Sequence, residues 1–125
     1  MKLLHSVTLP FALTNGNEGR TKTYWKPARF RKQVEAELML TGHSRRPWSH
    51  PVVVHVTRIL GPRQSKFDAD SLQRGNLKEV IDSLVTVGWF VDDGPKWIIE
   101  CRCFQDDENR ADGPAIRIEV FDATA

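Results

Sequence analysis

The residues VVVHVTRI, Val52 to Ile59, set the architecture of this chain. The stretch is rich in β-branched side chains, and its first half is apolar on both faces of an extended backbone. A strand that is apolar on both faces belongs in the middle of a sheet, where neighbours cover it. We therefore predict that residues 52–59 form a central strand around which the flanking segments pack.

A helix is predicted on each side of this strand. Pro27 opens the first, which runs to about Leu40 and carries one apolar stripe formed by Phe30, Val34 and Leu38. The second repeats apolar residues at helical spacing from Leu77 and ends near Val87, with Gly88 as its C-cap. Its start is ambiguous. Asn76 and Glu79 are spaced as in a capping box, whereas Ser71 could cap an earlier start.

Three further strands are predicted. Residues 3–9 form the first, and residues 96–104 and 115–121 form a hairpin around the acidic turn DDENRADGP. Alternation in the third strand places Trp97, Ile99, Cys101 and Cys103 on one face. The order β-α-β-α-β-β predicts an α/β (α+β) two-layer sandwich, with a mixed sheet and both helices on one face, as a single domain over residues 1–125.

Composition narrows the class of protein. The chain has 125 residues, 40% hydrophobic and 27% charged, which is typical of a globular domain. No uncharged apolar run approaches the ~20 residues of a membrane helix, and polar residues interrupt the apolar start, so we expect neither a membrane span nor a signal peptide. Two cysteines exclude a disulfide scaffold and favour a cytoplasmic protein.

Charge is divided unevenly along the chain. Residues 1–67 hold 12 Lys/Arg against 3 Asp/Glu, whereas residues 68–125 hold 6 against 13. A basic half favours a polyanionic partner, because each cation that neutralises a phosphate releases counterions. The candidate residues for such phosphate contacts are Lys22, Lys26, Arg45, Arg46, Arg63, Lys66 and Arg74.

Two pairs of carboxylates flank the second predicted helix. Asp68 and Asp70 precede it at the i, i+2 spacing that points both side chains the same way in an extended segment, and Asp92-Asp93 follow it. Carboxylates that converge at one end of a sheet suit Mg²⁺. The alternatives are a helix cap for Asp68 and Asp70 and an ordinary Asp-Gly turn for Asp92 and Asp93.

Lys78 lies at the margin of the helix's apolar stripe. Its ammonium could stabilise charge in phosphoryl transfer beside the carboxylates. The alternative is a surface ion pair with Asp82, one turn further on.

These residues together resemble the RusA-type Holliday junction resolvases. The family pattern is D-x-D-N, then K-x-x-x-D-x-L on a helix, then G-x-x-x-D-D. The matching stretches here are Asp68-Ala-Asp70, Lys78 to Leu84 and Gly88 to Asp93, and the resemblance covers nearly the whole chain. Ser71 stands where the family usually has Asn.

The resemblance implies a homodimeric, Mg²⁺-dependent endonuclease (Mn²⁺ being a possible substitute) that nicks opposing strands of four-way DNA junctions in recombination and repair. Such proteins are commonly encoded by phages or prophages. By position, Asp68, Asp70 and Asp93 match the metal ligands, with Asp92 as the alternate to Asp93. Lys78 matches the essential lysine because it keeps the K-x-x-x-D spacing, although Arg74 stands where shorter members have lysine.

Two other functions fit parts of the sequence. A PD-(D/E)xK nuclease would use Asp93 and Glu100, with Arg102 at the lysine position, where arginine is a poor substitute. A non-catalytic nucleic-acid-binding protein would use the aspartates only as caps and turns.

Overall fold

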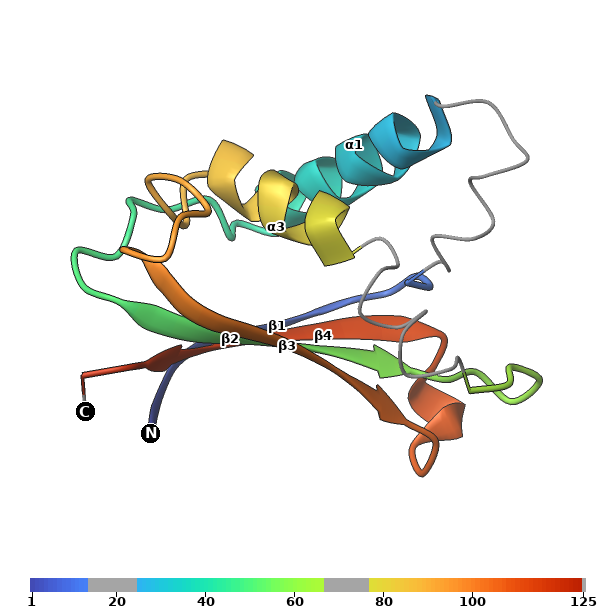
Figure 1. Ribbon diagram of the computed structural model, residues 1–125. Helices are drawn as coiled ribbons and strands as arrows, with labels where there is room; N and C mark the ends of the chain where they lie inside the picture. The colour runs from blue at the N-terminus through green and yellow to red at the C-terminus, as the bar shows by residue number, and fades with distance from the viewer. Residues whose placement is uncertain (14–24, 67–76, 125) are drawn as a thin grey trace.

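The computed structural model describes residues 1–13, 25–66 and 77–124, with side chains from Ala28 onward in the first helix. Within these ranges, one four-stranded mixed sheet carries two helices on one face (Figure 1). This confirms the predicted α/β sandwich and its element order. The elements are β1 (Lys2–Leu9), α1 (Trp25–Leu40), β2 (Val52–Ile59), α3 (Leu77–Thr86), β3 (Ile98–Asp106) and β4 (Ala115–Asp122).

The strand order is β1-β4-β2-β3. β2 pairs parallel with β3 and antiparallel with β4, and β4 pairs antiparallel with β1. β1, β2 and β3 therefore run in one direction, and α1 and α3 are both crossovers that step the same way along the sheet. Because such crossovers share one handedness, both helices lie over the same face, as Figure 1 shows.

The predicted hairpin of the last two strands is wrong. β2 lies between β3 and β4, so these consecutive strands do not pair with each other. Residues 107–114, which include a short 3-10 helix at Arg110–Asp112, cross the end of β2, a span of about two strand spacings or ~10 Å. β2 gains a hydrogen-bonded neighbour on each side, as its buried side chains require.

A bulge at the start of β3 changes which residues face the core. Val52 pairs with Ile98 but Val53 pairs with Glu100, so Ile99 is an extra residue. Ile98 is buried and Ile99 is 57% exposed, which contradicts the predicted inward position of Ile99. Beyond the bulge Cys103 is buried, as alternation predicts.

α3 ends at Gly88, whose positive φ of 94° suits a residue without a side chain. The Trp89 amide donates to the Leu84 carbonyl at 2.9 Å and the Gly88 amide donates to Val85 at 3.1 Å, which is a Schellman motif. A Cβ at Gly88 would collide with the carbonyl oxygen of Arg45. This close approach fixes the α1–β2 connection against the end of α3.

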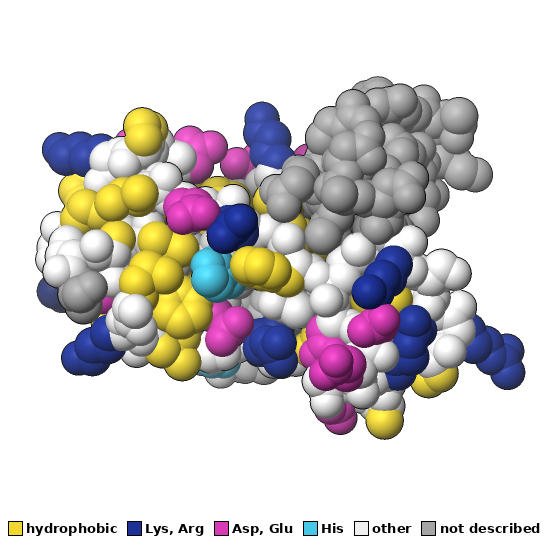
Figure 2. All heavy atoms as spheres, turned by 60° about the horizontal axis from the view of Figure 1, so that its bottom comes forward, with side chains coloured by type: hydrophobic (Ala, Val, Ile, Leu, Met, Phe, Trp, Pro, Cys, Tyr) yellow, Lys and Arg dark blue, Asp and Glu magenta, His cyan; other side chains and the backbone are white. Residues whose placement is uncertain are grey.

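No helix within the described ranges covers the second face of the sheet. In the middle of this face His55 packs between Phe104 and Phe121, with ring centroids 5.0 and 4.8 Å away. Figure 2 shows hydrophobic side chains mixed there with charges of both signs. Among the same described residues, no helix combines the length and the apolar character that crossing a bilayer requires.

Candidate functional site

A groove between α3 and β3 gathers charged side chains from three segments. Its volume is about 310 Å³. The charged residues are Lys78 from α3, Asp93 from the α3–β3 connection and Glu100 from β3. The remaining lining is Leu77, Ile81, Ile98, Ile99 and Cys101. The structure thus places Lys78, in the first turn of α3, and Asp93, in the connection that follows α3, on the lining of one groove.

Lys78 is exposed in the first turn of α3 because the apolar stripe of the helix turns toward the sheet. Asp82, the alternative partner, instead lies 3.9 Å from a guanidinium nitrogen of Arg31 on α1. Among the described residues Lys78 forms no ion pair. Its ammonium is therefore available to an anion bound in the groove.

The two adjacent aspartates have different roles in the structure. The Gly94 amide donates to Asp92 Oδ1 at 2.7 Å, so Asp92 closes a turn of the kind that Asp and Gly favour. Asp93 lines the groove and Asp92 does not. Of the two candidates for a metal ligand, the geometry favours Asp93.

Glu100 reaches the groove, but Arg102 does not line it. The Arg102 Nε lies 3.2 Å from Glu100 Oε1, and its guanidinium lies 5.9 Å from the centre of the Phe104 ring. The cation beside Asp93 and Glu100 in the groove is thus Lys78. The sequence assigned Glu100 a role only in the alternative nuclease. The bulge at Ile99, which changes how the start of β3 faces its surroundings, has no clear signal in the local sequence.

The two cysteines of β3 are thiols, not thiolates. Burial raises the pKa of Cys101 to about 11 and that of Cys103 to about 12. A thiol of that pKa is protonated at neutral pH and is a weak nucleophile. The chemistry available in the groove is therefore that of carboxylates and an ammonium.

Several predicted site residues lie outside the described residues. These are Lys22, Asp68, Asp70 and Arg74, together with the side chain of Lys26. Within the described ranges no three His, Cys, Asp or Glu side chains lie close enough to hold a metal ion. Asp93 and Glu100 supply carboxylate oxygens to the groove, and Mg²⁺ in proteins commonly takes one or two carboxylates and completes its shell with water and phosphate oxygens.

The described basic candidates lie on two loops at opposite ends of the sheet. Arg45 and Arg46 precede the start of β2, and Arg63 and Lys66 follow its end. An eight-residue strand separates its two ends by about 26 Å. These cations therefore form two separate basic loops, and a phosphate backbone would have to bridge them.

Arg45 belongs to a polar and aromatic cluster at the first of these loops. Its guanidinium lies 3.5 Å from the centre of the Trp48 ring, which is within cation–π range. Beside it His5 Nε2 lies 3.0 Å from His43 Nδ1, and the Trp89 indole donates to the His43 carbonyl at 2.7 Å. The hydrogen bond between the two imidazoles requires that one of the two facing nitrogens carries a proton and the other accepts it. When both facing nitrogens are protonated, neither can accept and the bond is lost. The cluster links β1 to the α1–β2 connection.

We expect the His5–His43 contact to make stability depend on pH. Burial lowers the pKa of His5 below its ordinary value of 6.5, and the nearby charges of His43 and Arg45 lower it further. The unfolded chain then binds a proton first as the pH falls. The contribution of His5 to the free energy of unfolding is therefore complete above pH 6.5. It declines as the pH falls from 6.5 through the pKa of His5 in the folded protein. Urea unfolding between pH 8 and pH 5 measures it.

The variant His5→Asn isolates this contribution because asparagine keeps a polar side chain but does not titrate. Its free energy of unfolding should fall less steeply below pH 6.5 than that of the unsubstituted protein. Equal slopes for the two proteins would show that the imidazole pair does not govern this pH range.

Comparison of the sequence with protein-family models and with curated proteins finds no match.

Proposed function

We propose that this protein is a Mg²⁺-dependent endonuclease that resolves four-way DNA junctions by paired symmetric nicks. The observation that carries the proposal is the groove lined by both Lys78 of α3 and Asp93 of the α3–β3 connection. The resemblance of residues 68–93 to the RusA-type pattern supports the same reaction, since it assigns these two residues to one site.

The chain's own residues have separable roles in this reaction. Asp93 would hold the metal, together with Asp68 and Asp70 by position in the family pattern. Bound Mg²⁺ supplies a water of lowered pKa and stabilises the leaving oxygen. Lys78, which has no ion-pair partner among the described residues, offsets the negative charge that develops on the phosphate.

The basic loops provide the contacts to DNA that do not depend on sequence. Arg45 and Arg46 at one end of the sheet, and Arg63 and Lys66 at the other, suit phosphate contacts that recognise the shape of a branched substrate. We further propose a homodimer, because two symmetric nicks in a roughly two-fold junction require two active sites related by a two-fold axis.

A PD-(D/E)xK-type nuclease is the second candidate, since Asp93 and Glu100 line one groove. In that case the lysine would come from α3 and not from the Arg102 position. The variants Asp70→Asn and Glu100→Gln separate the two candidates. Loss of cutting in Asp70→Asn alone supports the junction resolvase, and loss in Glu100→Gln alone supports the alternative.

The proposal is tested with a synthetic four-way junction labelled on each strand in turn. We expect nicks at symmetric positions on opposing strands with Mg²⁺ or Mn²⁺, and none with Ca²⁺ or on linear duplex of the same sequence. Binding without cutting under every metal condition would instead identify a non-catalytic nucleic-acid-binding protein.

A further inference from the structure

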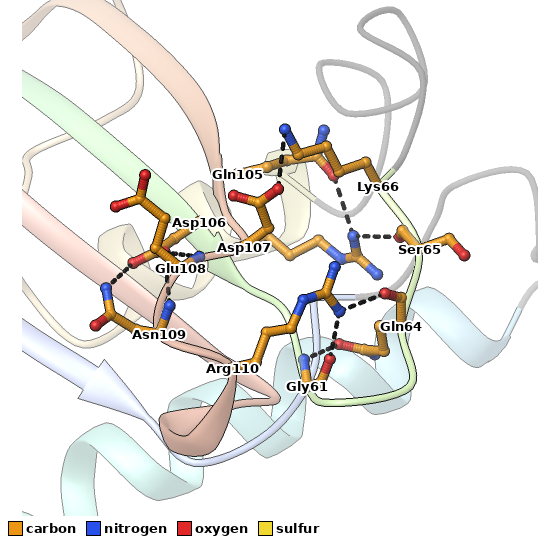
Figure 3. A network of polar contacts seen from close by, with 11 residues as sticks. Gly61, Gln64, Ser65, Lys66, Gln105, Asp106, Asp107, Glu108, Asn109 and Arg110 are labelled. Carbon is orange, nitrogen blue, oxygen red and sulfur yellow. Dashed lines mark hydrogen bonds and ion pairs between the residues drawn. The ribbon is translucent and has the colours of Figure 1, made fainter.

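The β3–β4 connection holds residues 61–65, the segment that follows β2, in place (Figure 3). Arg110 Nη1 donates to the carbonyls of Gly61 and Gln64 at 2.8 and 2.6 Å. From the strand side, Arg58 Nη1 donates to the Ser65 carbonyl at 3.0 Å. Two guanidinium groups thus fix the backbone of residues 61–65, which ends beside Lys66.

The β3–β4 connection is acidic and faces Lys66, one of the two basic residues that follow β2. Lys66 Nζ lies 3.2 Å from Asp107 Oδ2, and both side chains are substantially exposed, at 57% and 42%. Asp106 is occupied within the turn, where hydrogen bonds from Asn109 and Glu108 lower the pKa of its carboxyl. Asp107 is therefore the carboxylate of this turn that pairs with Lys66, and Figure 3 shows the two side chains directed toward each other.

We propose that Asp107 competes with nucleic-acid phosphate for Lys66, so that DNA binding exchanges one carboxylate for one phosphate at a loop already shaped for the contact. This rests on the proposed contact between Lys66 and DNA. The chemistry of the two partners is matched, because a carboxylate and a phosphate oxygen both accept charge-assisted hydrogen bonds from an ammonium. The exposed position of the pair allows the exchange, since such ion pairs are weak in water.

The substitution Asp107→Asn removes the competitor and should leave the loop where it is. The bonds that hold the loop run through Arg58 and Arg110, and the substitution touches neither. We expect binding of a four-way junction in Ca²⁺ to tighten by about two- to fivefold, the range of a lost exposed ion pair. In the unsubstituted protein, Asp107 takes up a cation from solution when Lys66 leaves it for DNA, which offsets part of the counterion release. Without this uptake, the slope of log K against log[salt] should steepen by at most about 0.9 in Asp107→Asn.

Glu108→Gln is the matched control. It removes the same unit charge from the neighbouring residue of the same turn, and the ion pair of Lys66 is with Asp107. A general effect of charge on DNA binding would change both variants equally. The proposal requires that Asp107→Asn binds more tightly than Glu108→Gln at each salt concentration.

A double-mutant cycle with Lys66→Ala completes the test. Lys66→Ala should weaken junction binding. In the Lys66→Ala background, Asp107→Asn should increase the affinity by little more than Glu108→Gln does. An undiminished gain without Lys66 overturns the proposal, and so does unchanged binding in Lys66→Ala. Neither result affects symmetric junction cutting by the unsubstituted protein, so failure of this inference is distinguishable from failure of the proposed function.

Discussion

Asp93→Asn should lower the rate of Mg²⁺-dependent junction cleavage by at least about 10²-fold, the scale on which loss of one electrostatic group at a reacting centre is measured. Asp93 lines the groove beside Lys78, and an amide cannot replace its charge at a metal ion. The measurement is the single-turnover rate at saturating protein and Mg²⁺. Junction binding in Ca²⁺ should persist or tighten, because a negative charge near phosphate is removed.

Asp92→Asn is the matched control for this substitution. It changes the adjacent residue in the same way, and asparagine can still accept the hydrogen bond from the Gly94 amide that closes the turn. Its cleavage rate should stay close to that of the unsubstituted protein. If Asp92→Asn lost cutting while Asp93→Asn kept it, the metal ligand would be Asp92, and the groove would not be the active site.

Lys78→Ala should lower turnover by about 10²-fold or more with little change in junction affinity, since its charge is placed to act on the transition state. A loss confined to the cleavage step distinguishes this role from a general phosphate contact, which would change affinity and its salt dependence. Single-turnover rates and binding in Ca²⁺ are measured on the same variant.

Two other cations serve as references for Lys78. Lys96 is exposed in the α3–β3 connection, with its ammonium 5.0 Å from the centre of the Trp97 ring, and does not line the groove. Lys96→Ala should therefore keep its cleavage rate. Arg74→Ala should mainly weaken binding. A large fall in turnover for Arg74→Ala, with Lys78→Ala active, would move the catalytic cation four residues toward the N-terminus in the sequence.

The elements of this fold could be predicted because their signals are local. Val34 and Leu38 are fully buried on the stripe that their spacing predicts, and Gly88 ends α3 with the positive φ expected of a C-cap. β2 spans the predicted residues 52–59, since β-branched residues that are apolar on both faces suit a central strand.

The pairing of the strands could not be predicted in the same way. Residues 107–114 carry turn chemistry that suits a tight hairpin and a wider crossing alike, and the choice depends on β2 occupying the place between β3 and β4. The prediction that Ile99 faces the core was wrong for a related reason. A bulge depends on register against a distant strand, and the alternating pattern of residues 96–104 contains no sign of it.

The candidate site could be predicted in part. The sequence pattern assigns Lys78 and Asp93 to one site, and both side chains line the same groove. Glu100 joins them only through the packing of α3 on β3. Arg58, which holds the basic loop, does have a sequence signal, because a charged side chain at the end of an apolar strand requires a polar partner such as the Ser65 carbonyl.

The central place of β4 has a consequence for how the chain reaches its native state. β4 is synthesised after the other three strands, yet it joins β1 to β2 and contributes Ile116, Ile118 and Val120 to the core. Until β4 emerges from the ribosome, β1 lacks the neighbour with which it pairs in the structure, and β2 lacks one of its two neighbours. The parallel pair of β2 and β3 can form before β4, but the sheet completes only through contacts between residues far apart in sequence, which are slow to form. Folding during translation should thus be deferred to the last strand, and the nascent chain carries its unpaired strand edges until then.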